Sequence, residues 1–77
     1  MVQSERYLIF IDKYIFIGKY KGKKKKKNMF CVFTQAQEYD EDAKLWFKLG
    51  TIYLNSEKIL SVKNVKGLKE YKKIIIP

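Results

Sequence analysis

The chain has 77 residues, enough for one small domain with a thin core, because such a chain buries only about 60% of its unfolded surface. Lysine and arginine number 17 against 8 aspartates and glutamates, a net charge of +9. Hydrophobic residues still make up 47% of the chain, which favours a folded domain over a disordered basic tail. The lysine- and isoleucine-rich, alanine-poor composition is typical of an AT-rich coding genome, such as that of a low-GC bacterium, its phages or mobile elements.

Several function classes are excluded by residues that the chain lacks. Histidine is absent and Cys31 is the only cysteine, so an internal disulfide is impossible and a zinc site has too few ligands. Neither a Ser/His/Asp set nor a glycine-rich phosphate loop occurs, so we expect no enzymatic activity and no cofactor. Residues 1–6 do not resemble a signal peptide, and the interrupted apolar run at 7–17 is too short to span a bilayer. We therefore expect a cytoplasmic protein without an integral membrane segment.

Abundant β-branched and aromatic residues, without helical spacing, predict three strands in the first half of the chain, at residues 7–11, 14–21 and 29–37. We expect a tight turn at Asp12 and Lys13, between the first two strands. Residues 22–28 are expected to be a loop, because adjacent ammonium groups repel one another and stay in water. Residues 38–42 read as an exposed acidic turn, since their spacing fits no calcium-binding loop.

The second half predicts further short strands, at residues 44–49, 51–55 and 59–65. Ser56 can cap a single helical turn over residues 56–58. Residues 68–73 fit either a short helix or a strand. Residues 74–76 are all isoleucine and should extend and pair, because an unpaired apolar strand edge would be sticky. An edge strand of this kind also leaves open a homo-oligomer.

The sharpest expectation is a hairpin with a two-residue loop at Leu49 and Gly50. This register pairs Phe47 with Ile52 and Trp46 with Tyr53. One face is then wholly apolar and belongs in the core; it carries Leu45, Phe47, Leu49, Ile52 and Leu54. The other face places Trp46 beside Tyr53, flanked by Lys44 and Lys48.

An outward Trp–Tyr pair between lysines has the composition of a platform for single-stranded nucleic acid, because aromatic rings stack on bases and ammonium groups hold phosphates. The alternative is that Trp46 is structural. It would then pack under a loop or against residues 74–76.

Residues 42–62 resemble the second half of an SH3-like barrel. The resemblance rests on an aromatic pair at Trp46 and Phe47, a glycine turn at Gly50, a strand, a one-turn helix at 56–58 and a final apolar strand. It implies a small barrel in which an aromatic at the position of Trp46 can line the ligand groove. The proline usual near the one-turn helix is absent, so the resemblance implies the fold more than it implies binding of proline-rich peptides. We expect an all-β domain over residues 1–77, either a five- to six-stranded SH3-like barrel or a strongly bent antiparallel sheet.

The lysine run is the main functional signal. Residues 13–27 contain eight lysines and no acid, and this local positive field attracts polyanions. Lysine favours diffuse contact with phosphates over bidentate reading of bases. The candidate binding residues are Lys19, Lys21, Lys23, Lys24, Lys25, Lys26, Lys27, Lys44, Trp46, Lys48 and Tyr53.

The sequence therefore predicts a non-enzymatic protein that binds DNA or RNA with low sequence specificity. Three alternatives stay open. The run could be a solvated loop, or the basic surface could dock on an acidic partner protein, as in a small inhibitor or adaptor. The protein could also sequester anionic nucleotides, which would require a concave basic pocket at an oligomer interface. Cys31 is expected to be a buried, inert thiol.

Overall fold

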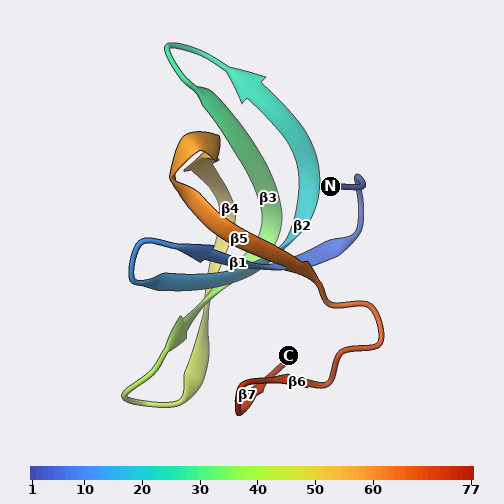
Figure 1. Ribbon diagram of the computed structural model, residues 1–77, viewed down its shortest axis with the longest axis vertical. Helices are drawn as coiled ribbons and strands as arrows, with labels where there is room; N and C mark the ends of the chain where they lie inside the picture. Colours follow the sequence, from blue (N-terminus) through green and yellow to red (C-terminus); the bar gives the residue numbers. More distant parts are fainter.

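Five strands form one antiparallel sheet in the order β4-β3-β2-β1-β5, and two short strands form a C-terminal ribbon, in a computed structural model that describes all 77 residues (Figure 1). This arrangement is all-β, as the sequence predicts, and is compatible with an SH3-like fold. The elements are β1 (Arg6–Ile11), β2 (Tyr14–Lys25), β3 (Met29–Asp40), β4 (Leu45–Asn55), the 3₁₀ turn η1 (Ser56–Lys58), β5 (Ile59–Asn64), β6 (Glu70–Tyr71) and β7 (Ile74–Ile75).

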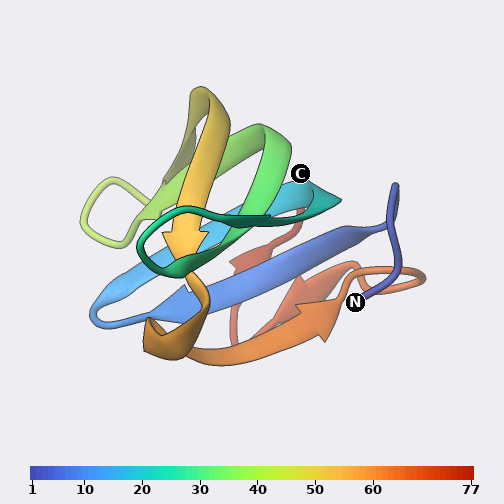
Figure 2. The same ribbon diagram turned by 90° about the horizontal axis from the view of Figure 1, so that it is seen from above.

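Strand β1 is apolar on both faces because both of its faces are covered. Leu8 and Ile9 are neighbours in the chain, point to opposite sides of the strand, and are both fully buried. Ile9 belongs to a first cluster inside the curve of the sheet, with Tyr7, Tyr20, Cys31 and Phe33. Figure 2 shows β3 and β4 curling over this side of β1.

The second cluster lies on the other side of β1 and is closed by the C-terminal residues. Leu8, Ile15 and Ile17 of the sheet are buried there together with Val65 and Ile74. The β6–β7 ribbon therefore covers a sheet face that would otherwise expose large apolar side chains. The expectation that residues 74–76 extend and pair is confirmed, since Ile74 pairs with Tyr71, Ile75 pairs with Glu70, and the Ile76 amide donates to the Lys69 carbonyl.

The long strands bend sharply near the middle of the sheet. A Cβ atom placed on Gly18 of β2 would lie 2.9 Å from the Cβ of Phe33, so only glycine allows β2 and β3 to approach this closely. The ladder between β3 and β4 shifts register around Ala36, which pairs with Gly50. Gln35 has a φ of 50° and Gly50 a φ of 88°, so both strands pass through the left-handed region at the same level.

The predicted hairpin at Leu49 and Gly50 is wrong. Residues 45–55 form one continuous strand that pairs with β3 along its length, and Gly50 marks the bend. The chain instead reverses at residues 41–44, where the Asp40 carboxylate accepts hydrogen bonds from the amides of Asp42 and Ala43. A glycine between two alternating segments is compatible with either a turn or a bulge, and the Asp40 turn decides between them.

The predicted core face of residues 44–55 is only half correct. Ile52 and Leu54 pack against the first cluster. Leu45, Phe47 and Leu49 are 57%, 50% and 45% exposed, because they lie beyond the bend, on a strand at the edge of the sheet.

Several predicted boundaries also shift. Strand β2 continues to Lys25, so the expected loop at 22–28 shrinks to a turn over residues 26–28. Strand β3 runs to Asp40, so the acidic turn begins later than expected. Residues 68–73 contain no helix; only Glu70–Tyr71 is a strand there. The one-turn helix is capped by Asn55, whose side chain accepts from the Glu57 amide, while the Ser56 hydroxyl donates to the Met29 carbonyl.

We predict that Phe33→Ala destabilises the protein by about 3–5 kcal/mol, because Phe33 is fully buried in the first cluster. Phe47→Ala should cost less than about 1 kcal/mol, because half of the ring is already in water. Urea denaturation in dilute solution measures both. A comparable loss for Phe47→Ala would show that this side chain is covered and that the edge position of β4 is wrong.

Candidate nucleic-acid interface

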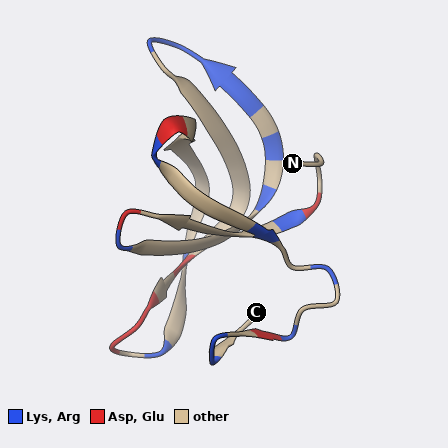
Figure 3. Cartoon of the chain, in the orientation of Figure 1, with Lys and Arg blue, Asp and Glu red and all other residues tan.

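Part of the lysine run lies on a strand rather than on a loop. Lys23, Lys24 and Lys25 end β2 and pair with Cys31, Phe30 and Met29 of β3. The Lys26 amide donates to the Asn28 carbonyl and closes the turn. We call residues 19–34 the lysine hairpin. Figure 3 shows its positive residues along β2 and at the tip, and the negative residues of the β3–β4 turn at the opposite end of the molecule.

The two faces of the lysine hairpin differ. Lys23 is opposite Cys31, whose side chain is in the first cluster, so Lys23 lies on the inner face. Lys24 is opposite Phe30 and lies on the outer face, because successive side chains of a strand alternate. Ammonium groups are therefore available on both sides of the hairpin.

On the outer face, lysines meet an exposed aromatic ring. Tyr53 of β4 pairs with Val32 of β3 and is 53% exposed. The Lys24 Nζ atom lies 5.9 Å from the centre of its ring. Lys24, Lys26, Phe30 and Tyr53 line a shallow recess of about 260 Å³. We call these four residues the outer patch; an aromatic face beside two ammonium groups suits a stacked base with its phosphate.

The predicted pairing of Trp46 with Tyr53 is wrong. Trp46 pairs with Tyr39, and the two ring centres are 5.1 Å apart. The Trp46 indole Nε1–H donates to the Ile75 carbonyl at 2.8 Å, and the ring packs against the second cluster. Trp46 is thus half-buried against the C-terminal residues, which is the structural alternative that the sequence left open.

The bend divides the predicted site residues into two groups. Lys19, Lys21, Lys23, Lys24, Lys25, Lys26, Lys27 and Tyr53 lie in or beside the lysine hairpin. Lys44, Trp46 and Lys48 lie on the other side of Gly50, next to the acidic turn. Sequence reasoning missed Phe30. Phe30 and Val32 alternate on one face of β3. This pattern points to the outer patch only once β3 is known to pair with β4, which carries Tyr53.

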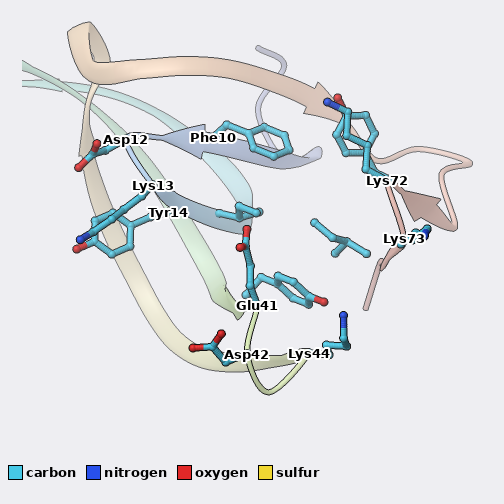
Figure 4. Close-up of a pocket in the computed structure, with 13 residues that line it drawn as sticks. Phe10, Asp12, Lys13, Tyr14, Glu41, Asp42, Lys44, Lys72 and Lys73 are labelled. Atoms are coloured by element: carbon cyan, nitrogen blue, oxygen red, sulfur yellow. The ribbon is translucent and has the colours of Figure 1, made fainter.

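A larger open cavity lies among three turns at the acidic end of the molecule (Figure 4). It measures about 650 Å³. Figure 4 shows acids and lysines of two turns, and lysines alone from the C-terminal turn, around the same space. Its charged lining residues are Asp12, Lys13, Glu41, Asp42, Lys44, Lys72 and Lys73. Three carboxylates among four ammonium groups do not select an anion, so this cavity is a weaker candidate for a polyanion than the lysine hairpin.

Cys31 is 2% exposed in the first cluster. Burial raises the pKa of its thiol, and the positive charge of Lys23 only partly opposes that effect. The thiolate that nucleophilic chemistry requires is therefore disfavoured. No group of three or more Cys, Asp or Glu side chains is placed to hold a metal ion.

No helix in the structure has the length and apolar character needed to cross a bilayer. Comparison with protein families, with curated proteins and with solved structures finds no match to this chain.

We predict that Trp46→Ala lowers the free energy of unfolding by roughly 1–3 kcal/mol, because it removes the bond to Ile75 and half-buried ring contacts. Tyr53→Ala should change it by less than about 1 kcal/mol, since its ring is more than half exposed. Thermal denaturation compares the two. Equal losses would contradict the separation of a structural Trp46 from an exposed Tyr53.

Proposed function

We propose that the protein is a small SH3-like barrel that binds nucleic acid through the lysine hairpin, without enzymatic activity and with low sequence specificity. Two features support the barrel. The strand order is β4-β3-β2-β1-β5, and a 3₁₀ turn leads from β4 into β5. The residues that resemble such barrels, 42–62, span β4, η1 and most of β5.

The observation that carries the binding proposal is the outer patch, which lies near the tip of the lysine hairpin. Six of the lysines, Lys21 and the five at residues 23–27, are exposed, and Lys24 lies over the ring of Tyr53. A polyanion that follows β2 would meet a row of ammonium groups and could stack a base on Tyr53 or Phe30. The strand pairing orders the backbone of Lys23, Lys24 and Lys25, which reduces the backbone entropy lost on binding.

Low sequence specificity follows from the side chains that are present. Lysine contacts a phosphate as a point charge, whereas bidentate reading of guanine favours arginine. The only arginine, Arg6, lies on β1 opposite Lys19, outside the outer patch. Contacts to phosphates should therefore dominate, and binding should weaken steeply as salt rises. A nucleic-acid ligand is compatible with the cytoplasmic location that the sequence predicts.

An acidic partner protein is the second candidate, because the same ammonium groups would meet its carboxylates. The outer patch distinguishes the two ligands. A nucleic acid can stack a base on Tyr53 and also contact the lysines, whereas a surface of carboxylates would contact only the lysines.

We predict that replacing residues 24–27 by glutamine lowers affinity for single-stranded DNA and RNA and reduces the slope of log K against log salt by about 0.7 for each lost phosphate contact. The matched control replaces four exposed lysines of the C-terminal region by glutamine: Lys66, Lys69, Lys72 and Lys73. Both variants change the net charge from +9 to +5, since four lysines become neutral. Equal effects would mean that total charge alone governs binding.

We also predict that Tyr53→Ala weakens binding of single-stranded oligonucleotides by about 5- to 150-fold, because one stacked base contributes about 1–3 kcal/mol. Tyr53→Phe should retain most of the affinity, because it keeps the ring. Fluorescence anisotropy titrations with single-stranded and duplex oligomers measure both variants. An unchanged affinity for Tyr53→Ala, with loss only in the lysine variant, would instead favour a ligand that offers charge and no bases.

A further inference from the structure

Strand β4 is an open edge of the sheet with exposed apolar side chains. Its only strand neighbour is β3, so the backbone groups on its other side have no strand partner. Leu45, Phe47 and Leu49 are each about half exposed on this edge. Natural proteins usually protect such an edge, because it offers both unpaired backbone groups and apolar contacts to another strand.

The residues of this edge are self-complementary. The sequence Leu45-Trp46-Phe47-Lys48-Leu49 has a leucine two positions before and two positions after Phe47. In an antiparallel pair of identical strands with the two-fold axis at Phe47, each Phe47 lies opposite the other. Leu45 then lies opposite Leu49 of the second copy. We infer that β4 pairs with β4 of a second copy of this chain in that register, to form a two-fold symmetric dimer.

The opposite face of the strand is also complementary in this register. Trp46 lies opposite Lys48 of the second copy, and symmetry repeats the pair. A lysine beside an indole is a favourable cation–π arrangement, and opposite side chains on adjacent strands are close enough to form it. A shift of one residue would lose this match, because the leucines would then face lysine, glycine or tryptophan. A shift of two residues would place Lys48 opposite Lys44 or Lys48 of the second copy, and like charges directly opposite one another are destabilising.

Charge opposes this contact less than it would oppose one through the lysine hairpin. Residues 37–50 carry four acids and two lysines in a chain of +9, and Lys72 and Lys73 of the C-terminal turn lie beside Glu41 and Asp42. The lysine hairpin lies on the far side of the bend (Figure 3). Pairing through residues 45–49 of β4 therefore keeps the lysine hairpins of the two copies apart. A dimer made this way would present two lysine hairpins to solvent.

The backbone limits the pairing to this segment. Lys44 has a φ of 55° and Gly50 a φ of 88°, so the strand turns away from a straight path at both ends. The residues between them are centred on Phe47. The other edge of the sheet, β5, is less suitable, because its ladder with β1 is irregular between Ile59 and Ser61 and Lys58 and Lys63 flank its apolar residues.

The paired segment is short, so the interface should be smaller than those of stable complexes and the dimer should be weak. Two chains of +9 also repel one another, and salt screens that repulsion. Salt should therefore strengthen dimerisation, whereas it should weaken nucleic-acid binding. The dimer does not depend on the proposed function. The opposite responses to salt distinguish dimerisation from nucleic-acid binding.

Disulfide crosslinking tests the register. In Phe47→Cys the new residues face each other with Cα atoms about 4.5–5.5 Å apart, within the range of a disulfide. Leu45→Cys and Leu49→Cys each place identical residues four positions out of step, about 13 Å apart. We expect Phe47→Cys to form covalent dimers with itself. Leu45→Cys and Leu49→Cys should form covalent dimers only when the two variants are mixed. Equal crosslinking of all three single variants, or none in any, would overturn the inference.

Sedimentation of the otherwise unmodified chain tests the dimer itself. At high protein concentration and high salt, we expect the wild type to dimerise and Phe47→Lys to remain monomeric. Leu60→Lys, at a 71% exposed apolar residue on the other edge, is the matched control and should still dimerise. Circular dichroism verifies that both variants are folded. A wild type that stays monomeric would overturn the inference, and the edge of β4 would then be open to a strand of another protein. A dimer that is lost only in Leu60→Lys would also overturn it.

Discussion

The close approach of β2 and β3 at Gly18 is the constraint on which the rest of the structure depends. The absent side chain brings the backbone of Gly18 against Phe33 and Ala36. At the same level, Gln35 and Gly50 adopt positive φ and let β3 and β4 bend together. Without this bend the sheet would lie open, and the first cluster would lack Phe33 as its fully buried centre.

The bend also separates two ends with different chemistry. One end carries the lysine hairpin and the outer patch, where ammonium groups lie beside Phe30 and Tyr53. The other end carries the acidic turn, the indole of Trp46 held by Ile75, and the exposed apolar edge of β4. A polyanion and a second protein chain would therefore use different surfaces. A chain of 77 residues thus presents two chemically different surfaces on one small sheet.

The sequence predicted features that depend on neighbouring residues. Local patterns predict the strands in residues 7–21, the tight turn at Asp12, the single helical turn and the pairing of residues 74–76. The bend could not be predicted in this way, because Gly50 suits a turn and a bulge equally well. The difference is decided by the carboxylate of Asp40, which closes the following turn. It is also decided by the match between Gln35 and Gly50 on adjacent strands.

The candidate site was predictable only in part for the same reason. The lysine run is visible as composition, and Tyr53 is on the surface as expected. The place of Trp46 depends on Ile75, which is 29 residues away in the chain, and no local pattern specifies that contact. Phe30 was missed because its neighbour Tyr53 belongs to β4, and the wrong hairpin paired Tyr53 with Trp46 instead.

The central claim is that a polyanion binds on the lysine side of the bend. Backbone amide chemical shifts recorded during titration with a short single-stranded oligonucleotide test it residue by residue. The account predicts that perturbations concentrate in residues 19–34 and 51–55 and fade as salt rises. Perturbations centred on Lys44, Trp46 and Lys48, with the hairpin unchanged, would contradict it.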